Sequence, residues 1–154
     1  MSKLAFPLAA LVLLCLLSCH KNQQPSTGGS GGDTPKEVTK ENLVGSYRVT
    51  KVEAQSGTQR SDITNTWFSS YAGDCAKDDL TIFNPDDSFV VLDGTVVCTE
   101  STDDTGTWKL LSKTQLKLDT DTAIIEALTA TTLRIVSPTY SNPQANIILT
   151  YTRQ

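Results

Sequence analysis

The sequence predicts an all-β domain built from eight antiparallel strands. Thr, Val, Ile and Leu occur in short runs, and these residue types suit the half-buried surface of a sheet. Within the runs, apolar and polar residues alternate with a period of two, and turn residues end each run. No segment after the N-terminal region carries apolar residues at helical spacing over several turns. These three observations favour short strands joined mostly by tight turns.

Residues 40–44 are expected to form one helical turn that leads into the first strand. In that strand Tyr47 and Val49 fall on one face, and Arg48 and Thr50 fall on the other. The eight expected strands are residues 45–50, 80–83, 88–92, 106–110, 115–119, 123–128, 132–136 and 146–152.

An up-and-down meander of these strands closes into a barrel if the first and last strands pair, which removes the exposed edges of an open sheet. An immunoglobulin-type sandwich is the alternative architecture. It needs longer connections that cross between two sheets. The chain has one long connection, residues 55–79, so the barrel is favoured.

Four motifs in a fixed order support the barrel. Together they resemble the lipocalin-like domain of small bacterial lipoproteins over residues 43–153, although Tyr47 stands where lipocalins usually carry Trp. The resemblance implies a barrel and little about function, because a fold does not fix a function. The motifs are Leu43-x-Gly45-x-Tyr47, Leu80-Thr81-Ile82-Phe83-Asn84-x-Asp86, Gly106-Thr107-Trp108-x-Leu110 and Leu149-Thr150-Tyr151-Thr152-Arg153.

The N-terminal segment predicts a lipid anchor. Lys3 is followed by an apolar run of about 14 residues, which is too short for the ~20 residues of a spanning helix. The run ends in Leu16-Leu17-Ser18-Cys19, which resembles the lipobox of bacterial lipoproteins. Cys15 is a poorer acyl site because Leu14, a large residue, precedes it. An ordinary signal peptide cleaved near Ser18 is the alternative.

The predicted organisation has three parts. Residues 1–18 form a lipoprotein signal peptide, residues 19–38 form the acylated Cys19 and a flexible Gly/Ser tether, and residues 39–154 form the lipocalin-like barrel. We therefore expect an outer-membrane lipoprotein of the cell envelope. The tether lacks an acidic run directly after Cys19, which favours the periplasmic side.

Charge and histidine content exclude several function classes. The chain carries 13 Lys and Arg against 17 Asp and Glu, a net charge of −4, so it repels nucleic acid and anionic headgroups. The single His is His20, in the tether. The expected domain therefore has no Ser-His-Asp or Cys-His relay and no His-based zinc site. The lack of histidine does not exclude catalysis by paired carboxylates or by a Ser-Lys dyad, but no sequence motif indicates either of them. We therefore expect no enzyme, no metal and no cofactor.

Cys75 and Cys98 are the two cysteines of the expected domain. Outside the cytoplasm such a pair favours a disulfide over a reactive thiol. The turn at residues 84–87 places Cys75 near residues 96–98 if strand pairing continues past Leu80. The pair also fits the lipocalin-like pattern.

The long connection carries the candidate ligand-binding residues Trp67, Phe68 and Tyr71. Trp67 and Tyr71 are four residues apart, so a short helix would place them on one face. They form either a plug that completes the core or a lid over a ligand mouth, because a barrel of about eight strands can hold one small ligand. The plug is favoured, since a short domain leaves little room inside.

Three acidic pairs, Asp78-Asp79, Asp86-Asp87 and Asp103-Asp104, lack the spacing of a calcium loop. We interpret them as solvated turn residues, and Trp108 as strand core. The expected function is non-catalytic binding of a small apolar ligand. The alternative is an accessory subunit that contacts another envelope protein through the barrel surface.

Overall fold

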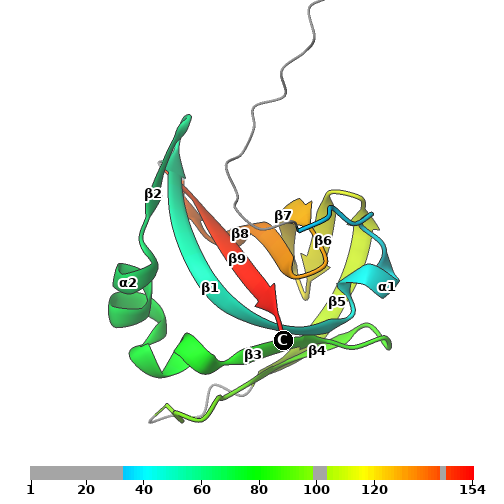
Figure 1. The fold of residues 1–154 in the computed structure, drawn as a ribbon, viewed down its shortest axis with the longest axis horizontal. Coiled ribbons are helices and arrows are strands. Elements are labelled where there is room, and N and C mark those ends of the chain that lie inside the picture. The colour runs from blue at the N-terminus through cyan, green and yellow to red at the C-terminus, as the bar shows by residue number, and fades with distance from the viewer. Residues whose placement is uncertain (1–32, 99–103, 143–144) are drawn as a thin grey trace, which may run out of the picture. The chain divides into compact units, whose positions relative to one another are not determined.

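The computed structural model describes residues 33–98, 104–142 and 145–154, and Cys19 with its lipobox lies outside them. The strands follow one another around a closed antiparallel barrel of eight strands, which confirms the predicted meander (Figure 1). One additional strand outside the barrel, β2, pairs with the end of β1. The elements are α1 (Lys40–Leu43), β1 (Gly45–Ser56), β2 (Gln59–Asp62), α2 (Thr64–Trp67), η1 (Phe68–Ala72), η2 (Asp74–Asp78), β3 (Leu80–Phe83), β4 (Ser88–Leu92), β5 (Asp104–Ser112), β6 (Gln115–Leu118), β7 (Asp121–Leu128), β8 (Thr132–Asn142) and β9 (Ala145–Arg153).

The first strand closes the barrel because it pairs on both of its edges. Residues 45–47 of β1 pair with β3, and residues 47–55 pair with β9. A bulge between Val49 and Lys51 interrupts the second ladder, and a bulge bends its strand. This bend lets one long strand serve both neighbours.

The alternation seen in the sequence places apolar side chains inside the barrel. In β7, Ala123, Ile125 and Leu128 are buried, and a bulge at residue 126 shifts the period between the last two. Three rings meet in the core. The Phe83 ring lies 5.8 Å from the Tyr47 ring and 5.4 Å from the Trp108 ring, edge to face, as aromatic pairs prefer. Trp108 is buried, as predicted, and its Nε1 donates to the carbonyl of Asn84 at 3.0 Å.

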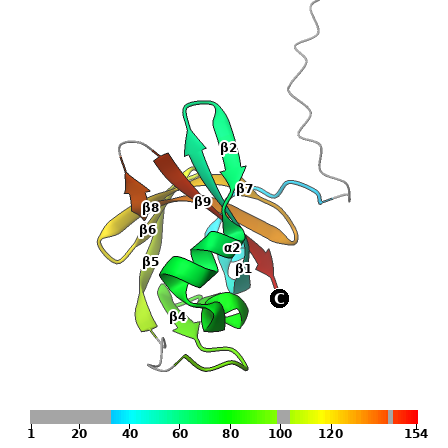
Figure 2. The ribbon, with the colours of Figure 1, turned by 90° about the vertical axis from the view of Figure 1, so that its left-hand side faces the viewer.

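The long connection differs from the expectation at its start. Residues 55–62 complete a β1–β2 hairpin, and only then do α2 and two further helical turns run to β3. Figure 2 shows these helical turns in front of the strands. The hairpin was missed because all four residues of β2 are exposed and polar, so no apolar alternation marks them.

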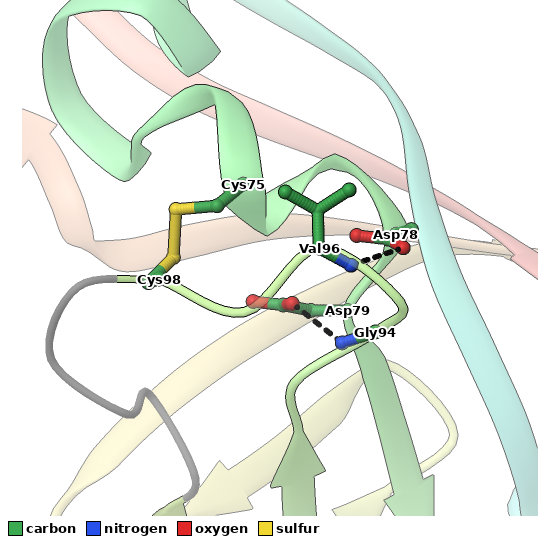
Figure 3. Close-up of a disulfide and its surroundings, with 6 residues drawn as sticks. All are labelled: Cys75, Asp78, Asp79, Gly94, Val96 and Cys98. Atoms are coloured by element: carbon green, nitrogen blue, oxygen red, sulfur yellow. Dashed lines mark hydrogen bonds between the residues drawn. A yellow bond between two sulfur atoms is a disulfide. The ribbon is translucent and has the colours of Figure 1, made fainter.

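The Cys75–Cys98 disulfide is present, with Cα atoms 5.3 Å apart (Figure 3). The prediction that continued strand pairing past Leu80 brings the two cysteines together was wrong. The β3–β4 ladder ends at the pair Leu80–Leu92, and Cys75 lies in the 3₁₀ turn η2 and not in a strand. The disulfide therefore joins a helical turn to the loop after β4.

Two carboxylates hold the same loop. Asp78 accepts hydrogen bonds from the amides of Thr95 (2.6 Å) and Val96 (3.2 Å), and Asp79 accepts one from the amide of Gly94 (3.2 Å). These side chains bind backbone groups 15 to 18 residues away, so they fix a long-range contact. Asp86 is a local turn residue, as predicted, since it accepts from the amide and hydroxyl of Ser88.

The end of the expected tether lies on the barrel. Asp33 accepts hydrogen bonds from the hydroxyls of Thr129 and Thr131, and the Lys36 amide donates to the Leu128 carbonyl at 2.9 Å. These bonds, led by the one from Thr129, hold the pKa of Asp33 below its ordinary value. Asp33 and Lys36, which belong to the expected tether, thus contact the barrel at and next to the β7–β8 turn.

Candidate ligand-binding site

A cavity of about 330 Å³ lies at one end of the barrel and is lined by residues of β4, β5, β6, β7, β8 and β9. This volume is at the small end of the ~300–1,000 Å³ range of small-molecule pockets. The apolar part of its lining consists of Phe89, Leu118, Ile135, Leu149 and Tyr151.

Strand register explains why these side chains point inward. Leu118 pairs with Trp108, and Ile135 pairs with Leu149. Directly paired residues lie on one face of a sheet, and the buried Trp108 and Ile135 identify that face as the inner one. The cavity is therefore continuous with the inner face of the barrel, and Ser137, two residues after Ile135, lines it as a buried polar residue.

Three carboxylates line the cavity at the ends of strands. Asp104 is the first residue of β5, Asp121 is the first residue of β7, and Asp119 lies in the β6–β7 connection. Because neighbouring strands are antiparallel, these positions meet at the same end of the barrel. We call Asp104, Asp119 and Asp121 the acidic rim.

Asp119 is held in a defined position. Its Oδ1 accepts hydrogen bonds from the amide (2.7 Å) and the hydroxyl (3.1 Å) of Thr107. Its Oδ2 lies over Gly106, where an added Cβ would be only 2.4 Å from this oxygen and 2.5 Å from Cε1 of Phe89. The missing side chain of Gly106 thus leaves the space that the carboxylate and the Phe89 ring share.

The predicted aromatic residues occupy a different place. Trp67 is 7% exposed and Phe68 is 4% exposed, and both pack in the core cluster, as a plug would. Tyr71 is 75% exposed and stacks on Trp67 with ring centroids 5.7 Å apart, so the short-helix spacing was correct. None of the three lines the cavity, and a role for them in ligand binding stays a prediction.

The other end of the barrel is closed by α1. Thr39 caps this helix by accepting from the Asn42 amide at 3.3 Å, and Leu43 is fully buried. Tyr47 donates its hydroxyl to the Leu43 carbonyl at 2.9 Å, which ties the cap to β1. The acidic rim and α1 therefore lie at opposite ends of the strands.

A network of ion pairs, not foreseen from the sequence, crosses the strands outside the core cluster. Arg134 on β8 contacts Glu53 on β1 (2.5 Å) and Glu126 on β7 (3.1 Å), and Arg60 on β2 contacts Glu126 at 3.0 Å. Glu53 also contacts Lys51 at 3.1 Å. Each carboxylate faces cations, so the network ties strands together and does not present an acid–base pair.

Among residues 33–98, 104–142 and 145–154, no group of three or more His, Cys, Asp and Glu side chains could hold a metal ion, and the acidic rim is no exception. In the same part of the chain, no helix is long and apolar enough to cross a bilayer. A comparison with models of protein families finds no match, and none of the curated proteins matches the chain. The assignment of a function therefore depends on the site itself.

Proposed function

We propose that this chain is a binding module that takes a small, largely apolar ligand into the barrel. One observation supports this proposal, the cavity with five apolar side chains on the inner face of the strands. Burial of apolar ligand surface stabilises a complex by roughly 25 cal/mol per Å² before the costs of association.

The proposal includes the lipocalin-like family and the location. An eight-stranded meander barrel that closes through its first and last strands supports the family resemblance. Acylation of Cys19 would place the barrel at the outer membrane, facing the periplasm. The membrane is then a partner through the lipid, and a net charge of −4 argues against nucleic acid.

We further propose that binding is not coupled to catalysis. The only His of the chain is His20, and Glu53 and Glu126 are engaged by arginine and lysine side chains. The turnover of bound compounds would contradict this part of the proposal.

The cavity can be tested by filling it. Ser137→Leu adds an apolar side chain to the lining, and Thr122→Leu adds the same side chain at an exposed position of β7. We expect wild type and Thr122→Leu to bind the neutral fluorescent probe N-phenyl-1-naphthylamine, and Ser137→Leu to bind it at least about tenfold more weakly with a similar circular dichroism spectrum. No binding by wild type, or equal binding by all three, would overturn the proposal.

The anchor has its own test. Cys19→Ala should abolish labelling by radioactive palmitate and release the protein from membranes into the soluble periplasmic fraction. Cys15→Ala is the matched control, and this variant should still be labelled and should still fractionate with membranes. Retention of unlabelled Cys19→Ala on membranes would refute the lipid anchor.

One observation favours a second candidate function, contact with another envelope protein. Tyr71, Val96 and Val97 are 75%, 59% and 65% exposed; Tyr71 lies four residues before Cys75, and the two valines directly precede Cys98. Large exposed apolar side chains that cluster often mark an interaction surface. If wild type binds no apolar probe, and the variant Tyr71→Ser/Val97→Ser loses a cross-linked partner that wild type shows, this function replaces the first.

A further inference from the structure

We infer that the ligand of the barrel carries a cationic group at one end of an apolar body, as a protonated primary amine on a short hydrocarbon does. This inference rests on the proposed function and names the chemical class of its ligand. It follows from where the cavity places its two kinds of lining side chain.

The charged side chains that the described residues contribute to the cavity are all acidic. The described residues that line the cavity include the three carboxylates of the acidic rim and no Lys or Arg. A concave site lined by charges of one sign focuses the field and raises the local concentration of counter-ions. A cation at the acidic rim is thus attracted, and an anion such as a fatty-acid carboxylate is repelled.

The apolar part lies deeper along the strands. Asp121 begins β7 and Asp104 begins β5, whereas Leu149 and Ile135 are interior positions of β9 and β8. A ligand that buries its hydrocarbon against Leu149 and Ile135 therefore leaves its other end at the acidic rim. The site selects for molecules with these two parts in this order.

The rim charge is also preorganised. Thr107 holds one oxygen of Asp119 with two hydrogen bonds, and the other oxygen lies beside the Phe89 ring over Gly106. A carboxylate that is fixed before binding loses little conformational entropy when a cation binds. Less of the electrostatic interaction energy is therefore offset, and the affinity for the cation is higher.

The metal alternative fits the rim less well. A divalent ion needs several oxygen ligands that converge at 2.0–2.6 Å. The three rim carboxylates do not form such a group in the described structure. A separated set of carboxylates matches a diffuse organic cation better than a chelated ion.

Three probes with the same hydrocarbon chain test the inference. Octylammonium, octanol and octanoate are titrated into the full mature domain by calorimetry at low ionic strength. We expect octylammonium to bind about tenfold tighter than octanol, because a few unit charges near 4 Å in water-like surroundings contribute on the order of one factor of ten. Octanoate should bind more weakly than octanol.

Two variants with equal changes in net charge locate the effect. Asp104→Asn/Asp119→Asn/Asp121→Asn neutralises the rim while an amide oxygen can still accept from Thr107. Glu37→Gln/Glu41→Gln/Asp74→Asn neutralises three exposed carboxylates that do not line the cavity. The first variant should lose the preference for octylammonium and keep octanol binding, and the second should retain the preference.

The outcomes separate the two proposals. If none of the probes binds wild type, the proposed function fails. If octanol binds but octylammonium gains nothing, or if the rim variant keeps the gain, the function stands and the cationic class is refuted. Tighter binding of octanoate than of octanol would also refute it.

Discussion

Arg153 lies over the ring of Tyr47, with its guanidinium carbon 4.8 Å from the ring centroid. The two residues belong to the last and the first strand, and Tyr47 pairs with Arg153 in the ladder that closes the barrel. Arg153 also donates to the carbonyls of Val44 (2.8 Å) and Asn42 and to the Tyr47 hydroxyl. One side chain therefore joins the C-terminal strand, the first strand and the end of α1.

Replacement of Arg153 should open this end of the barrel. We expect Arg153→Met to lower the free energy of unfolding by about 2–4 kcal/mol, because hydrogen bonds to a charged group contribute roughly 1.5–3 kcal/mol each and are not additive. Arg153→Lys keeps the charge without the planar fork and should recover only part of the loss. Urea unfolding measures both variants, and equal stability of Arg153→Met and wild type would show that the contact is dispensable.

The disulfide should stabilise the domain. Cys75→Ser should lower the free energy of unfolding by roughly 2–4 kcal/mol, because the cross-link restricts the unfolded chain over a sequence separation of 23 residues. Thiol titration of the denatured, non-reduced wild-type protein should find neither Cys75 nor Cys98 reactive. Two reactive thiols in protein isolated from the periplasm would contradict the bond and reopen a redox role.

The sequence was sufficient for the barrel and insufficient for the site, for physical reasons. A strand such as residues 115–118 can be predicted from the sequence, because burial of one face makes apolar and polar residues alternate with a period of two. The cavity combines side chains such as Phe89 and Leu149 that are 60 positions apart, and no local period marks such a set. The sequence does not predict that Asp119 lies on the rim, because Asp is common in tight turns, where its side chain hydrogen-bonds to the nearby backbone.

The plug and its exposed neighbour should respond differently to truncation. Trp67→Ala should cost about 3–5 kcal/mol, as removal of a buried large aromatic side chain does. Tyr71→Ala should cost no more than about 1 kcal/mol, since this residue is exposed and loses mainly its stacking on Trp67. Thermal melts compare the two, and a small effect of Trp67→Ala together with weaker probe binding would favour the lid.

Gly106 should link stability to the ligand site. In Gly106→Ala the new Cβ would lie 2.4 Å from Oδ2 of Asp119 and 2.5 Å from Cε1 of Phe89, so these side chains must shift. We expect the free energy of unfolding to fall by about 1–3 kcal/mol and probe binding to weaken. Gly57→Ala is the control. It meets no atom within 4 Å, although its φ of +58° is unfavourable for Ala. The control should lose stability without losing probe affinity, and unchanged binding by Gly106→Ala would separate Gly106 from the site.

The contact of residue 33 with the β7–β8 turn should depend on acid pH. The pKa of Asp33 is lowered in the folded protein by hydrogen bonds from Thr129 and Thr131, so ionised Asp33 stabilises the fold. This contribution is complete above 3.8, the ordinary pKa of the group, and is lost as pH falls through the lowered value. The amide proton of Thr131, which donates to Asp33, should report the change by NMR, and Asp33→Asn should remove that titration. If the amide shift of Thr131 follows the same acid titration in both proteins, another group is responsible, and Asp33 does not hold the N-terminal segment by its charge.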